Sequence, residues 1–181
     1  MGATFGAART TLLFSDGTKP LLEQLAVSAS LEYRASARVT IVGAAGAVLV
    51  GHLGPAATSP GGVGSVGVSM LLVEQAGFIP FVQFSGSLAV AAMRVVDTNY
   101  VAIDFRAGVA AGWTFLERLT PYAVVRAFGG PVFYGPELGT DAYHVQLGAG
   151  LVVGLPWGLD LSAEVIPLGE QRVTAGLGFS F

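Results

Sequence analysis

Eight polar side chains are the groups with the chemistry to build a site in this chain: Glu32, Asp104, Arg106, Arg126, His144, Gln146, Glu164 and Arg172. Their charges nearly balance, which predicts a network of ion pairs and hydrogen bonds, because a buried charge without a partner is costly. A sharper alternative takes His144 as a base, Glu164 as its carboxylate and Ser162 as a nucleophile. The network is the favoured interpretation, so we expect no enzymatic activity.

Other kinds of site find little support in the residue types. Two histidines and no cysteine, without a spaced carboxylate cluster, predict neither a metal site nor a disulfide framework. The run Gly61-Gly62-Val63-Gly64 lacks the lysine of a phosphate-binding loop. A formal charge of -3 and a single lysine, Lys19, argue against nucleic acid. We therefore expect no cofactor and no nucleic-acid partner.

The composition indicates a membrane protein. Of 181 residues, 52% are hydrophobic and only 12% are charged, and the mean hydropathy is +0.66. A soluble domain this apolar would lack the polar surface to cover itself. A membrane-spanning helix needs roughly 20 consecutive apolar residues, whereas the best stretch, 39–53, contains His52 and three glycines. A closed β-barrel is the other structure that pairs every backbone group within lipid, so the sequence favours a barrel.

Apolar residues alternate with small or polar ones along the chain, which is typical of barrel strands that face lipid on one side. In 100–115 the alternation places Asp104 and Arg106 on the inward face together with glycine, alanine and threonine. The same pattern runs through 24–33, 143–155 and 172–181. Weaker alternation marks 4–13, 38–51, 64–73, 80–93, 121–133 and 159–167.

Turn-forming residues separate these segments. The stretches 54–64 and 134–141 are rich in glycine, proline and polar residues and are expected to be loops. We therefore predict one domain, residues 1–181, with an all-β, antiparallel, up-and-down transmembrane barrel of ten strands. Eight strands is the fallback if 4–13 is a lead-in and one further segment is not a strand. With ten strands, both chain termini lie at the same end.

Aromatic side chains fall near both expected ends of the barrel, where amphipathic rings sit at lipid headgroups. At the end that carries the termini, the predicted girdle is Tyr33, Trp113, Phe115, Trp157, Phe179 and Phe181. At the opposite end it is Phe14, Tyr100, Phe133, Tyr134 and Tyr143. Ordinary packing in a protein core is the alternative explanation for these rings.

The C-terminal segment carries a short motif: Thr174, then Gly176, with phenylalanines at the third-last and last positions, Phe179 and Phe181. This motif resembles the C-terminal insertion signal of bacterial outer-membrane proteins. In size and alternation, nearly the whole chain resembles the small OmpA/OmpX-like, opacity-type barrels of the porin class. The resemblance implies recognition by the outer-membrane assembly machinery, contact with outer-membrane lipid and location in a Gram-negative outer membrane.

Such proteins are made with a signal peptide, and Met1-Gly2-Ala3-Thr4-Phe5 has no basic or long apolar region of that kind. The simplest hypothesis is a mature form with an added Met1. The expected function is non-enzymatic: a structural barrel, or a narrow pore for water, ions or small solutes. The alternative is an outer-membrane lipid hydrolase or deacylase that uses His144 with a carboxylate and a serine. The sequence leaves the oligomeric state open.

Overall fold

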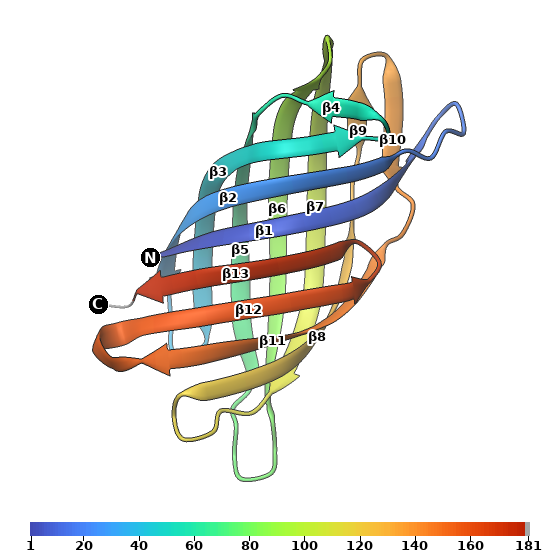
Figure 1. Ribbon diagram of the computed structural model, residues 1–181. Helices are drawn as coiled ribbons and strands as arrows, with labels where there is room; N and C mark the ends of the chain where they lie inside the picture. Colours follow the sequence, from blue (N-terminus) through green and yellow to red (C-terminus); the bar gives the residue numbers. More distant parts are fainter. Residues whose placement is uncertain (180–181) are drawn as a thin grey trace.

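The computed structural model describes residues 1–179, which form β-strands almost throughout (Figure 1). Ten strands are long: β1 (Gly2–Phe14), β2 (Leu21–Arg34), β3 (Val39–Leu53), β5 (Gly61–Val73), β6 (Phe81–Val95), β7 (Thr98–Gly112), β8 (Leu119–Gly129), β11 (Val145–Leu155), β12 (Leu159–Leu168) and β13 (Gln171–Phe179). Three are short: β4 (Ala56–Thr58), β9 (Val132–Tyr134) and β10 (Glu137–Asp141). A 3-10 turn, η1, covers Pro156–Gly158. Across residues 1–179, no helix has the length and apolar character needed to cross a bilayer.

The ten long strands close into a ring, because each of them pairs antiparallel with two others. The order around the ring is β1, β2, β3, β5, β6, β7, β8, β11, β12 and β13. Strand β13 then pairs back with β1, from Gly2 opposite Gly178 to Arg9 opposite Gln171. Figure 1 shows the strands wrapping around one enclosed space, which we call the lumen. The predicted all-β, antiparallel sheet is confirmed at this level.

The ring has two different ends. At one end, the loop end, the connections are 15–20, 54–60, 96–97, 130–144 and 169–170. At the other, the terminus end, they are 35–38, 74–80, 113–118 and 156–158. The N-terminal ammonium also lies at the terminus end, where it donates a hydrogen bond of 2.8 Å to the carbonyl oxygen of Phe179. The start of β1 and the end of β13 are therefore neighbours.

The sheet has thirteen strands, so the predicted count of ten, and the fallback of eight, are wrong. The three additional strands are the short ones at the loop end. Strand β4 pairs with β3 and β6, β9 pairs with β7 and β10, and β10 pairs with β1. The sequence predicts loops at 54–64 and 134–141 because of their turn residues. Their backbone groups still need partners, and the ends of the long strands supply them.

The segment 121–133, predicted as one strand, is interrupted at Gly129. This glycine has a φ of +142°, which residues with a side chain rarely adopt. A Cβ at Gly129 would also lie 2.8 Å from Nδ1 of His144. Pro131 follows and has no backbone N–H to give to a ladder. The chain therefore leaves β8 and re-enters the sheet as β9.

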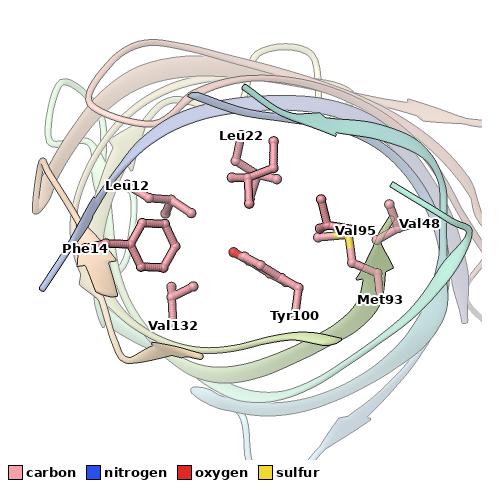
Figure 2. Close-up of a cluster of buried hydrophobic side chains, with 9 residues drawn as sticks. Leu12, Phe14, Leu22, Val48, Met93, Val95, Tyr100 and Val132 are labelled. Atoms are coloured by element: carbon pink, nitrogen blue, oxygen red, sulfur yellow. The ribbon is translucent and has the colours of Figure 1, made fainter. Parts of the chain in front are cut away.

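Large apolar side chains fill the lumen at the loop end. These residues, which we call the plug, are Leu12, Phe14, Leu22, Val48, Leu53, Met93, Val95, Tyr100 and Val132. All are at most 6% exposed, and Figure 2 shows the labelled members pointing from the wall toward the middle of the ring. The prediction that Phe14 and Tyr100 belong to an outward girdle is wrong, because both lie inside the plug. Their inward positions follow from the strand alternation.

Apolar side chains also cover the outward side of the strands, here called the outer face. They come from every part of the ring and include Phe5, Val27, Leu31, Val66, Val68, Leu88, Val90, Phe105, Val125, Leu147, Leu161, Val173 and Leu177, all exposed. A polar row crosses this face near the loop end, where Gln171, Arg9, Glu23 and His52 stand opposite one another on four neighbouring strands. Below that row, toward the terminus end, the face is apolar.

Candidate functional site in the lumen

Strand alternation carries most of the predicted site residues to the inside of the ring. Asp104 and Arg106 lie on β7, Arg126 on β8, Gln146 on β11, Glu164 on β12 and Arg172 on β13. Each of these side chains is partly or fully buried, whereas its neighbours in sequence point to the outer face. The strands therefore gather, in one space, charges that lie up to 68 residues apart in sequence, from Asp104 to Arg172.

Glu170 is the centre of the larger polar group, the Glu170 cluster, made of Asp104, Arg106, Gln146, Glu170 and Arg172. Its Oε2 accepts hydrogen bonds from Nη2 of Arg106 at 2.6 Å and from Nε2 of Gln146 at 2.9 Å. Its Oε1 accepts one from Nε of Arg172 at 3.0 Å. Arg106 also bonds the Asp104 carboxylate through Nε. One buried carboxylate thus holds two guanidinium groups, which offsets the cost of removing all three from water.

Arg126 and Glu164 form a second, separate pair. The two guanidinium nitrogens Nη1 and Nη2 donate to Oε1 and Oε2 of Glu164, both at 2.7 Å. The Tyr122 hydroxyl donates a third hydrogen bond to Oε2 at 3.0 Å. Two parallel N–H···O bonds are the strongest arrangement an arginine makes with a carboxylate. This geometry fixes the Glu164 carboxylate and leaves it little freedom to act as a base.

Asp141 stands apart from both groups. It lies at the end of β10, and its Oδ1 accepts a hydrogen bond of 3.2 Å from the hydroxyl of Thr10 on β1. Within residues 1–179 it forms no ion pair. Within the described residues, the Asp141 carboxylate therefore has one side-chain partner, the neutral hydroxyl of Thr10.

His144 and Glu32 do not join these groups. His144 lies between β10 and β11, is exposed, and has Nδ1 at 3.3 Å from the carbonyl oxygen of Phe128. Among the described residues it makes no hydrogen bond to Glu164 or to Ser162, so the three side chains of the hydrolase alternative are not connected. Glu32 is exposed near the end of β2, at the terminus end of the ring. Two of the eight predicted residues are therefore outside the polar groups.

Sequence reasoning missed Glu170, Tyr122, Asp141 and Thr10. Asp141 falls in the expected loop 134–141, and Glu170 follows the predicted strand 159–167 without an assigned role. A usable signal was present, because Glu170 precedes the inward-facing Arg172 by two residues and therefore shares its face. For Tyr122 and Thr10 the alternation gives the face, but only the closed ring brings them to Glu164 and Asp141.

A cavity of about 310 Å³ lies between the plug and the terminus end of the lumen. Plug residues Leu12, Leu22 and Tyr100 border it on one side. Charged residues of the Glu170 cluster and Asp141 form part of its wall, and Gln24, Val63, Val90 and Ile103 also line it. Many of the remaining lining residues are small or carry a hydroxyl, among them Thr4, Gly6, Ala8, Thr10, Ala26, Ser28, Ala44, Ser65, Ser87, Ala102 and Thr174. The cavity thus combines charged and hydroxyl groups with small apolar side chains, below an apolar closure.

Two further features bear on the predicted roles. In the described part of the chain, no three His, Cys, Asp or Glu side chains are grouped so that they could hold a metal ion. Of the C-terminal motif, Thr174 and Gly176 are half-buried on the inward side of β13, and Phe179 is exposed on the outer face. Phe181 lies outside the described residues.

Comparison with known proteins gives distant likenesses among solved structures. No protein-family model matches the chain, and no curated protein matches it. Among solved structures, the transport unit of the autotransporter AIDA-I from Escherichia coli is 14% identical, with a TM-score of 0.45 over 99% of this chain and 90% of that one. Two variants of Rhodopseudomonas blastica porin are 9% and 10% identical over the full length of both chains, with TM-scores of 0.20 and 0.19. At these TM-scores the likeness assigns no fold family.

Proposed function

We propose that the protein is an integral β-barrel of a bacterial outer membrane, with a structural rather than an enzymatic role. The observation that carries this proposal is the outer face, which presents large exposed apolar side chains from all around the closed ring. A soluble monomer rarely exposes contiguous apolar patches of more than a few hundred Å². In lipid the same surface is stable.

The closed ring supports the same proposal from the backbone. A bilayer offers no hydrogen-bond partners, so a structure that crosses it must pair its own backbone groups. Each long strand here has a partner on both sides, including the β13–β1 pair. An open sheet with the same outer face would leave two edges unpaired in lipid.

Exposed aromatic residues at the terminus end fit a headgroup region. Tyr33, Trp113, Phe115, Trp157 and Phe179 are all exposed there. At the loop end the girdle reduces to Phe133 and Tyr143, because Tyr134 packs against Phe14 with ring centroids 6.0 Å apart. The polar row of Gln171, Arg9, Glu23 and His52 would then lie at the headgroups of the opposite leaflet. The aromatic and polar rows bound an apolar band between them.

The plug argues for a barrel that is closed to ions. Its residues are at most 6% exposed and fill the loop end of the lumen. Below it, the hydrogen bonds of the Glu170 cluster cross the lumen. A narrow pore for water, ions or small solutes is the second candidate, favoured by the cavity of about 310 Å³ beneath the plug. Such a pore would conduct only after the plug rearranged.

The C-terminal residues Thr174, Gly176, Phe179 and Phe181 supply the proposed contact with the assembly machinery. Thr174, Gly176 and Phe179 lie on β13, one of the two strands that close the ring. Assembly machinery that binds β13 would cover its unpaired edge until β1 pairs with it.

Expression with a secretory signal peptide in a Gram-negative host tests the location. We expect the chain in the outer-membrane fraction, with a β-type far-UV spectrum after extraction in detergent. Val109→Arg, in the outer face of β7, should lower the free energy of unfolding in lipid by about 2–4 kcal/mol. Arg94→Ala, at the loop end of β6, is its control and should change little. A folded protein that stays in solution without detergent would refute the proposal.

Planar-bilayer recording separates the two candidate roles. The structural barrel predicts no discrete conductance from the parent protein. Steps of current that change in size in Arg106→Ala would instead establish the narrow pore.

A further inference from the structure

The plug bounds the cavity on its loop-end side. A volume of about 310 Å³ corresponds to about ten water molecules, at roughly 30 Å³ each in the liquid. The space is large enough for a small organic molecule.

The charged wall of this cavity carries one excess negative charge. Asp104, Asp141 and Glu170 contribute three carboxylates, and Arg106 and Arg172 contribute two guanidinium groups. Asp104 and Glu170 are both bound to guanidinium groups. The excess therefore falls on Asp141, whose partner is the neutral hydroxyl of Thr10.

Tyr100 provides an independent pointer to a ligand in the same cavity. Its side chain is 1% exposed and lines the cavity, and Figure 2 shows its hydroxyl directed toward the middle of the ring. Within residues 1–179 this hydroxyl makes no hydrogen bond to another side chain or to the backbone. Because Tyr100 lines the cavity and its hydroxyl has no partner within the described residues, a ligand in the cavity can hydrogen-bond to it.

The rest of the wall indicates the remaining chemistry of the ligand. Ala8, Ala26 and Ala102 line the cavity close to the plug residues Leu12 and Leu22, which gives an apolar surface beside the carboxylates. A bare metal ion would leave this surface unused. A small organic cation would use both surfaces.

We propose that the cavity binds a small primary alkylammonium ion. Its ammonium group donates hydrogen bonds to the Asp141 carboxylate and to the Tyr100 oxygen, and its alkyl chain packs on the alanine wall. An ammonium group carries three donors and one positive charge, which neutralises the excess charge of the wall. This inference goes beyond the proposed role in the membrane, because it requires only that the ring closes.

The experiment is calorimetric titration of the refolded protein in detergent micelles with n-butylammonium chloride. We expect saturable binding at one site per chain. Butyrate and 1-butanol, which have the same carbon chain without the positive charge, should bind at least about tenfold more weakly, because each lacks the charge-assisted hydrogen bond. Potassium chloride at the same concentration should not compete.

Variants locate the site. Asp141→Asn should weaken n-butylammonium binding about tenfold or more, and Tyr100→Phe, which keeps the ring, should weaken it several-fold. The matched control is Glu23→Gln, which removes one carboxylate charge on the outer face and should leave binding unchanged. If Asp141→Asn does not refold to a β-type spectrum, Tyr100→Phe alone locates the site.

Several outcomes would overturn the inference: no saturable binding to the refolded parent protein, equal affinity in Tyr100→Phe and the parent, or tight binding of butyrate. Competition by potassium would mean that the site binds inorganic cations, and would overturn the proposed alkylammonium ligand. Each of these binding results can occur in a protein that inserts normally into lipid. Failure of the ligand proposal is therefore distinguishable from failure of the proposed membrane barrel.

Discussion

The two ends of the lumen are built on the same strands but differ completely in what fills them. On β1 the inward residues change in size from the terminus end to the loop end: Gly2, Thr4, Gly6, Ala8, Thr10, Leu12 and Phe14. On β6 the inward residues at the loop end are Val95 and Met93, followed by alanines and then Ser87 and Ser85. At one end the interior is apolar and inaccessible to water, and at the other it is small, hydroxylated and partly exposed.

Closure of the ring therefore does not decide whether the lumen is open. The backbone alternation is the same at both ends, so side-chain volume at inward positions closes one end and leaves space at the other. The buried ion pairs lie between the two ends. They separate a region that behaves like a protein core from one that behaves like a polar surface.

The largest effect is expected at the boundary between the two ends. Arg126→Ala would leave the Glu164 carboxylate buried with only the Tyr122 hydroxyl, and should lower the free energy of unfolding by about 3–5 kcal/mol. The measurement is urea unfolding in lipid vesicles. Arg9→Ala is the control, because the Arg9–Glu23 pair is exposed on the outer face and should contribute less than about 1 kcal/mol. An equal loss of unfolding free energy in both variants would contradict the expectation that the buried ion pair contributes more than the exposed one.

The plug should behave as a core, and the terminus end should not. Leu12→Ala removes buried side-chain volume and should cost about 2–5 kcal/mol of unfolding free energy. Ser87→Ala, at an inward position of β6 below the plug, should change it by no more than about 0.5 kcal/mol. Unfolding of both variants in the same vesicles makes the comparison direct. A loss at Ser87 as large as that at Leu12 would mean that the two ends do not differ energetically.

Two glycines on β3 compare the lumen side of the wall, where Gly46 lies, with the outer face, where Gly43 lies. A Cβ at Gly46 would lie 2.0 Å from the carbonyl oxygen of Val27, whereas at Gly43 it would meet nothing within 4 Å. Gly46→Ala should therefore lower the free energy of unfolding by about 1–3 kcal/mol. Gly43→Ala should leave it unchanged or raise it by about 0.5–1 kcal/mol, because alanine loses less backbone entropy on folding. A higher free energy of unfolding in Gly43→Ala would show that backbone entropy dominates at this position. A lower one would show that the added methyl group does not fit.

The smallest effect is expected outside the strands, in the connection 15–20. Hydrogen bonds to Asp16 from the backbone N–H and then from the hydroxyl of Thr18 lower the pKa of this exposed carboxyl below its ordinary value of 3.8. A depressed folded-state pKa stabilises the turn above the unfolded pKa, and this contribution is lost as the pH falls through the folded value. NMR titration of the Asp16 carboxyl carbon should give a midpoint below 3.8, and Thr18→Ala should raise it. An unchanged midpoint in Thr18→Ala would remove the proposed cause.

Sequence reasoning succeeded where one face of a strand is apolar and the other is small or polar. In 100–115 the alternation alone places Asp104 and Arg106 together on one face, and both lie on the lumen side of β7. It also locates segments that match all ten long strands. Side-chain partners were not predictable, because the pairing of Arg126 with Glu164 depends on how β8, β11 and β12 lie around the ring.

The plug was not predicted, for a physical reason. Large aromatic residues near the ends of barrel strands are expected to face the lipid headgroups, whereas Phe14 and Tyr100 lie in the lumen. A lumen that is closed at one end needs such residues inside as well. The signal was the weak alternation in 4–13 and 80–93, where both faces are apolar toward the loop end. Segments such as 134–141 were missed as strands because local turn residues say nothing of the strand ends that pair with them.

The pairing of β13 with β1 has a consequence for how the molecule folds. It joins residues at opposite ends of the sequence, with Gly2 opposite Gly178, whereas the other neighbours in the ring are close in the chain. Loop-closure entropy makes such a contact the slowest to form. Until it forms, β1 and β13 are two open edges, each a template for another chain. Ring closure is therefore the step at which folding competes with aggregation.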